Sequence, residues 1–131
     1  MLNPKSKWEI GEHTLSLGCI ASMCAQRRYE DDWEVTVVFV PEEDLKFWAI
    51  CINLKDRRQF TFEDLSIQGL DSVKFWVPPD IDDRKVLEMQ AMRSDVEKEV
   101  REGLKMLVQF ILKHGIMLTK AGLVKLNALI R

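Results

Sequence analysis

The sequence predicts an α+β domain in which an antiparallel β-meander precedes helices, and three observations indicate this. Within residues 8–77, apolar residues alternate with other residues in short runs separated by polar segments, as in a meander of four to five strands. Residues 81–114 repeat apolar residues every three or four positions, which predicts one long helix, and residues 119–130 do so over a shorter length. Because the strands come first, we expect the helices to cover one face of the sheet.

The strands follow from alternation with a period of two. The polar segment 26–32 and the acidic segment that begins at Pro41 are expected to be turns. The whole chain, 1–131, is then one domain with a sheet part at 1–79 and a helical part at 80–131. The clearest alternation predicts strands over residues 15–25, 33–40, 45–54 and 72–77, and weaker alternation suggests short strands over 8–13 and 60–62.

The long helix has signals at both ends. Pro78 and Pro79 precede acidic residues, which favour the positive end of a helix. Lys113 and His114 occupy the expected last turn, and Gly115 suits the left-handed residue that follows many helices. Between these ends the apolar residues form a stripe along one side of the helix, made by Val86, Met89, Met92, Val96 and Val100 and continued by Leu104, Leu107 and Ile111.

The predicted helix is long for its domain. An unbroken helix over 81–114 would extend roughly 50 Å, whereas a compact domain of this size is about 35 Å across. Either the helix bends at Gly103 and lies over its own sheet, or it projects and meets a second copy or another protein. Residues 93–102 are expected to be mostly solvated, since only Val96 and Val100 are apolar there. We therefore expect a non-enzymatic interaction protein that presents either the long helix, through the stripe from Val86 to Val100, or the edge of the sheet to a protein partner, with a homodimer as one arrangement.

Composition limits the classes of partner. A net charge of −2 over 131 residues does not favour binding of the whole protein to nucleic acid or to anionic lipid. The charge is nevertheless segregated, because residues 61–100 carry ten acidic and five basic side chains, and residues 101–131 carry six basic and one acidic. The first residues lack the apolar run of a signal peptide, and no apolar stretch approaches a membrane span, so we expect a cytoplasmic protein without a membrane partner.

Neither a metal site nor a catalytic motif stands out. Cys19 and Cys24 would point to opposite faces of one strand, so with Cys51 they are expected to be free thiols rather than zinc ligands. The two histidines, His13 and His114, do not lie beside a serine or cysteine in a known nucleophile motif, and no glycine-rich phosphate loop is present. We expect no cofactor and no enzyme activity. Small proteins of this kind are often regulators, adaptors or inhibitors, including those carried by phages.

A repeated tripeptide supports an alternative function. Lys-Phe-Trp occurs twice in predicted strands, and in each copy the lysine and the tryptophan share one face. If the two strands are neighbours, these residues form a basic aromatic platform on which unpaired bases could stack, aided by lysines of the C-terminal helix. Alternatively, the tryptophans lie under the helix and are structural. The residues of this nucleic-acid alternative are Lys46, Trp48, Lys74, Trp76, Lys120 and Lys125.

Overall fold

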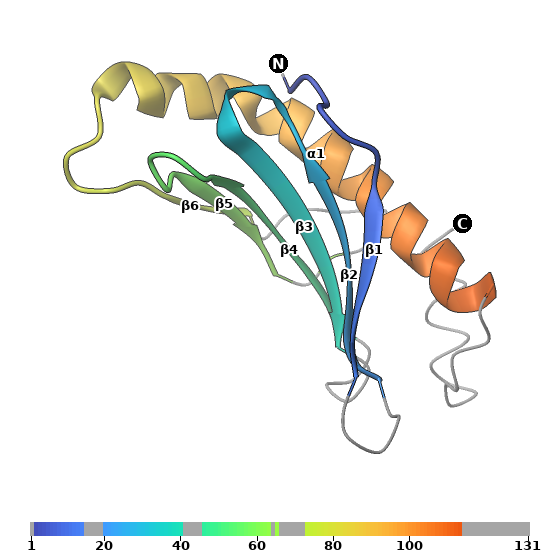
Figure 1. Cartoon of the computed structure of the whole chain (residues 1–131). Helices are drawn as coiled ribbons and strands as arrows, with labels where there is room; N and C mark the ends of the chain where they lie inside the picture. Colours follow the sequence, from blue (N-terminus) through green and yellow to red (C-terminus); the bar gives the residue numbers. More distant parts are fainter. Residues whose placement is uncertain (1, 15–19, 41–45, 64, 66–72, 114–131) are drawn as a thin grey trace.

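The computed structural model describes residues 2–14, 20–40, 46–63, 65 and 73–113. In this part of the chain, six strands form one antiparallel sheet in sequence order, and α1 lies across one face of that sheet (Figure 1). The predicted α+β class and the meander are confirmed. The elements are β1 (Glu9–Thr14), β2 (Ile20–Arg28), the 3-10 helix η1 (Glu30–Asp32), β3 (Trp33–Val40), β4 (Lys46–Asn53), β5 (Gln59–Phe62), β6 (Val73–Trp76) and α1 (Asp83–Lys113).

The expected number of four to five strands was too low, because both short candidate strands join the sheet. β1 pairs with β2, and β5 pairs with β4 and β6. The turn expected over 26–32 was also too long, since Gln26–Arg28 still pair with β3. The chain reverses only at η1, where Asp31 and Asp32 adopt positive φ angles of 61° and 66°. Polar side chains are compatible with a strand here because Gln26 and Arg28 are exposed.

The core lies between α1 and the sheet face that we call the inner face. Along β3 and β4, every second side chain is buried on this face, as the period of two requires. The helix contributes its apolar stripe to the same core. The inner-face residues are Met23, Ala25, Val35, Val37, Phe39, Phe47, Ala49, Cys51, Phe60 and Phe62, and those of α1 are Met89, Met92, Val96, Val100, Leu104, Leu107, Val108 and Ile111.

The helix is unbroken at Gly103, so the bend suggested there is not found. α1 is helical over all 31 residues, about 46 Å, and it runs over β2, β3 and β4. Gly103 instead permits a close approach to the sheet and the N-terminal segment. A Cβ atom at this position would lie 2.6 Å from Cη2 of Trp8 and 3.0 Å from Cγ2 of Val37. The second helix predicted over 119–130 and the stop signal at Gly115 lie outside the described residues.

Two arginines connect α1 to the sheet. Arg27, on β2, lies 3.6 Å from a carboxylate oxygen of Glu99, which also accepts a 2.9 Å hydrogen bond from the hydroxyl of Tyr29. Burial and this bond to Glu99 raise the pKa of Tyr29 above its usual value, so the phenol stays neutral. This polar group holds the middle of the helix against β2.

Arg58 makes the second connection, near the start of α1. Its side chain is buried, donates to Asp56 at 2.9 Å and to the carbonyl of Lys85 at 3.1 Å, and packs over the Trp33 ring. Burial opposes ionisation of Asp56, but hydrogen bonds from Arg58 and Lys85 outweigh it and lower the pKa of Asp56. The β4–β5 turn is therefore fixed to the first turns of the helix.

Candidate interaction surface

The sheet face that points away from α1, which we call the outer face, carries exposed aromatic side chains. The residues of β4 that alternate with its buried ones are Trp48, Ile50 and Ile52. Trp48 is 39% exposed, and Trp76 on β6 is 48% exposed. Two exposed tryptophans on one face, with further apolar residues near them, make this face the candidate interaction surface.

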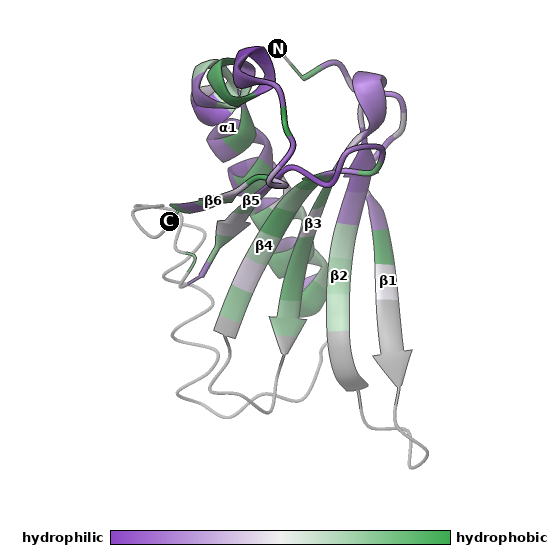
Figure 2. Cartoon of the chain, turned by 90° about the vertical axis from the view of Figure 1, so that its left-hand side faces the viewer, coloured by the Kyte–Doolittle hydropathy of each residue, from purple (hydrophilic) through white to green (hydrophobic). Residues whose placement is uncertain are grey.

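Strand register places further apolar residues beside Trp48. Val38 of β3 is directly opposite Trp48, and Ile50 and Ile52 continue along β4. Ile52 is opposite Gln59 of β5, which in turn is opposite Trp76, so the tryptophan of β6 lies in the same cross-strand row. Figure 2 shows the sheet with α1 behind it and with β3 and β4 hydrophobic over most of their length. We call this set the outer-face cluster: Val38, Trp48, Ile50, Ile52 and Trp76.

Charged pairs lie on both sides of the outer-face cluster. On the β2–β3 side, Arg28 donates to Glu34 at 3.2 Å, and these residues are direct cross-strand partners. On the β5–β6 side, Lys74 lies 2.9 Å from Glu63. Glu9 of β1, opposite Gln26, adds a further exposed carboxylate on the β2 side. An apolar centre between polar margins resembles the anatomy of protein–protein interfaces.

The two Lys-Phe-Trp tripeptides are only partly brought together. Trp48, Lys74 and Trp76 do share the outer face, and all three are exposed. However, β5 lies between β4 and β6, so the two strands are not neighbours. Lys46 is the first residue of β4, opposite Val40. Lys120 and Lys125 lie outside the described residues.

The helix stripe proposed to contact a partner lies in the core of the protein. Met89, Met92, Val96 and Val100 are at most 4% exposed and pack against the inner face of the sheet, and Val86 is half-buried. The section expected to be mostly solvated therefore buries Val96 and Val100 completely. These side chains stabilise the fold, whereas the exposed tryptophans lie on the other side of the sheet.

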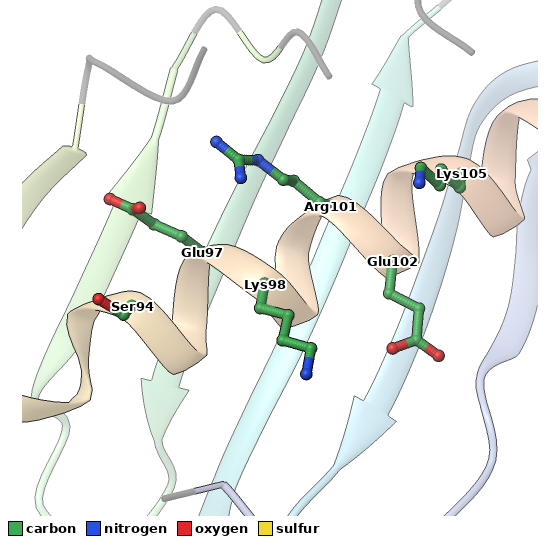
Figure 3. A pocket seen from close by; sticks show the side chains of 6 residues that line it. All are labelled: Ser94, Glu97, Lys98, Arg101, Glu102 and Lys105. Atoms are coloured by element: carbon green, nitrogen blue, oxygen red, sulfur yellow. The ribbon is translucent and has the colours of Figure 1, made fainter. Parts of the chain in front are cut away.

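The opposite side of α1 is charged. Figure 3 shows a shallow hollow whose lining side chains all come from this one helix and extend in different directions. Positive and negative groups are mixed, and nearby Arg93 pairs with Glu97 at 3.0 Å. A mixed, solvated helix face of this kind needs no ligand to explain it. The lining residues are Ser94, Glu97, Lys98, Arg101, Glu102 and Lys105.

The cysteines and histidines do not form a chemical centre in the described ranges. No group of three His, Cys, Asp or Glu side chains could hold a metal ion there. Cys24 and Cys51 are free, and burial raises the pKa of the Cys51 thiol, which keeps it protonated and unreactive. His13 belongs to β1, whereas Cys19 and His114 lie outside the described residues. None of the helices in the described ranges is long and apolar enough to cross a membrane.

Sequence reasoning missed the outer-face cluster as a unit, although one signal was present. β4 is apolar at both parities, since Ile50 and Ile52 alternate with Ala49 and Cys51. Only one of these sets can face α1, so the run indicates a strand with a second apolar face. Comparison of the chain with protein-family models, curated proteins and solved structures finds no match.

Proposed function

We propose that this chain is a non-enzymatic protein-interaction module, of the regulator, adaptor or inhibitor class, that binds its partner through the outer face of the sheet. The observation that carries the proposal is the exposure of Trp48 and Trp76 at either end of an apolar cluster. A tryptophan has roughly 250 Å² of surface, so each of these side chains presents about 100 Å² to water. Removing that area from water contributes about 2–3 kcal/mol per tryptophan, which offsets part of the entropy cost of association.

The surroundings of the two tryptophans suit a protein partner. Trp is among the residues that contribute most to binding energy at protein interfaces, particularly when less critical contacts around it exclude water. Val38, Ile50 and Ile52 provide an apolar centre, and the flanking ion pairs provide a polar rim. The proposed contact surface is therefore the outer face of the sheet and not the helix stripe, which is buried.

The test is capture of partners on the tagged protein from a lysate of the source organism, with matched variants. Trp48→Lys and Trp76→Lys place a charge in the outer-face cluster, and both are expected to abolish recovery of a protein that the unmodified chain retains. Leu87→Lys is the control, because Leu87 is 63% exposed on α1. Equal recovery by all three variants, each shown to be folded by circular dichroism, would contradict the proposal.

Binding of single-stranded nucleic acid is the second candidate, and the shared face of Trp48, Lys74 and Trp76 favours it. The pairing of Lys74 with Glu63 and of Arg28 with Glu34 weighs against it, because these two pairs give the outer face no excess of positive charge. The test is titration with an oligonucleotide at low salt, followed by tryptophan fluorescence. Quenching that salt reverses would support this candidate, and unchanged fluorescence would eliminate it. Nuclease treatment of the lysate eluate separates the two candidates in the first experiment.

A further inference from the structure

We infer that the partner of the outer face is a second copy of this chain. The two copies pack face to face about a two-fold axis that runs parallel to β4, midway between the two sheets. The inference rests on the proposed function, because it names the occupant of the same surface. Packed sheets lie about 10 Å apart with their strands within about 30° of each other, so the side chains of two outer faces would interdigitate.

The apolar residues of the outer face are centred on one strand. Trp48, Ile50 and Ile52 all belong to β4, with β2 and β3 on one side of it and β5 and β6 on the other. A two-fold axis along β4 places these three residues against the same three residues of the second copy. A two-fold contact uses one patch twice, and a patch with its apolar residues on the axis is self-complementary.

The polar residues on the two sides of β4 are compatible under this symmetry. The axis exchanges the β2–β3 side for the β5–β6 side, so Glu34 of one copy lies over Gln59 of the other and Lys74 lies over Gln26. These two charged side chains therefore meet uncharged polar groups, and neither faces a charge of the same sign.

Strand register makes the match specific. Arg28, Glu34, Ile52, Gln59 and Trp76 form one cross-strand row. Rotation about β4 therefore places Trp76 of one copy over Arg28 of the other, where the guanidinium can stack on the indole ring. In the single chain, Trp76 is 48% exposed and the side chain of Arg28 is 68% exposed. The neighbouring row places Thr61 of one copy over Thr36 of the other.

The size of the face indicates how tightly the two copies bind. The five strands β2–β6, at about 4.8 Å spacing, span roughly 20 Å, but β5 and β6 have only four residues each, which span roughly 13 Å. Even with its corrugation, the patch therefore lies below the roughly 800 Å² per partner that stable complexes bury. The dimer should therefore dissociate on dilution, with a Kd on the order of micromolar rather than nanomolar.

The first test is analytical ultracentrifugation of the full chain over a wide concentration range. We expect the mass to change from that of one chain to that of two with increasing concentration. Trp48→Lys, which puts a charge on the axis, should remain monomeric at every concentration, and Leu87→Lys should dimerise like the unmodified protein. Circular dichroism establishes that each variant is folded. A monomer at all concentrations, or a dimer that persists in Trp48→Lys, overturns the inference.

The second test addresses the register and does not depend on a disruptive variant. In a chain whose three native cysteines are replaced by alanine, Thr36→Cys and Thr61→Cys proteins are mixed and treated with a short thiol-to-thiol cross-linker. The mixture should give far more cross-linked dimer than either variant alone, whereas Ile50→Cys alone should cross-link to itself. Equal yields in the mixture and in the separate Thr36→Cys and Thr61→Cys samples would overturn the β4 axis.

The two proposals can fail separately. If the chain is monomeric but Trp48→Lys still abolishes capture of a different protein from the lysate, the proposed function stands and the second copy is excluded. If Trp48→Lys changes neither the mass nor the capture, the outer face is not the contact surface and both proposals fail.

Discussion

Replacing Gly103 with alanine tests the close approach of α1 to Trp8, and two opposing effects decide its sign. In a solvated helix the change would stabilise the protein by about 1 kcal/mol, because alanine has the higher helix propensity. Here the added Cβ would lie 2.6 Å and 2.8 Å from two ring carbons of Trp8 and 3.0 Å from Val37. Such overpacking costs about 1–3 kcal/mol. We therefore expect Gly103→Ala to lower the free energy of unfolding by about 1 kcal/mol.

The sign should reverse when Trp8 is replaced by leucine. The shorter side chain removes the ring carbons that the added Cβ would meet, and only the contact with Val37 remains. In a Trp8→Leu protein, Gly103→Ala is expected to raise the free energy of unfolding by up to about 1 kcal/mol. The difference between the two backgrounds, about 1–2 kcal/mol, measures the coupling between residues 8 and 103.

Urea denaturation followed by far-ultraviolet circular dichroism provides the four free energies. Tryptophan fluorescence is unsuitable because one variant removes a tryptophan. Ser94→Ala, at an exposed position of the same helix, is the control and should have the same small effect in both backgrounds. If Gly103→Ala stabilises the protein while Trp8 is present, or costs as much without Trp8 as with it, the close contact does not limit the packing of α1.

The polar groups that fix α1 to the sheet give three more predictions. Arg58→Met should lower the free energy of unfolding in urea by about 3 kcal/mol, because it removes the buried bonds to Asp56 and to the carbonyl of Lys85 and leaves Asp56 with Lys85 as its remaining cation; a loss below about 1 kcal/mol would contradict this role. The pKa of Asp56 is lowered in the folded state, so its contribution to stability is present above its unfolded pKa of about 3.9 and is lost as the pH falls through the folded value. Asp56→Asn should therefore reduce the dependence of the melting temperature on pH below about 4, and an unchanged dependence would argue against the shift. Tyr29 is the one tyrosine in the sequence, and its pKa is raised in the folded state. Phenolate absorbance should therefore stay absent as the pH passes about 10 and appear only when alkali unfolds the protein. Phenolate absorbance at that pH in a protein with native circular dichroism would disprove the raised pKa.

Much of the fold could be predicted because its strands and helix differ in period. β3 and β4 were predicted within one residue of their ends, since turn-forming residues flank each run of alternation. The start of α1 was predicted within two residues from the prolines and acidic residues before it. The short strands β1 and β5 were harder to predict, because four to six residues show too little alternation to separate a strand from a loop.

The surface could be predicted only in part. Parity placed Trp48 on the same side of its strand as Lys46, but β4 is apolar on both faces, so periodicity could not tell which face meets the helix. The stripe from Val86 to Val100 was assigned to a partner because the predicted helix, roughly 50 Å long, exceeds the width of about 35 Å expected for a compact domain of this size. In fact the helix crosses the sheet and packs on it along most of its length (Figure 1).

The contacts between Arg27, Tyr29 and Glu99 had no signal in the sequence. Tyr29 and Glu99 are 70 residues apart, and single charged residues on a strand and on a helix are compatible with many pairings. Only the packing of α1 on β2 brings these side chains together, so a prediction of this group requires the tertiary arrangement first.

The sequential strand order has a consequence for synthesis of the protein. Each strand pairs with the strand before it in the chain, so the sheet can grow hairpin by hairpin as the residues leave the ribosome. Its inner face, with Val35, Val37 and Phe39, is covered only when α1 follows. At about 5–20 residues per second, the 31 residues of α1 take roughly 2–6 s to translate. Aggregation therefore competes with folding mainly in the interval between completion of β6 and release of α1.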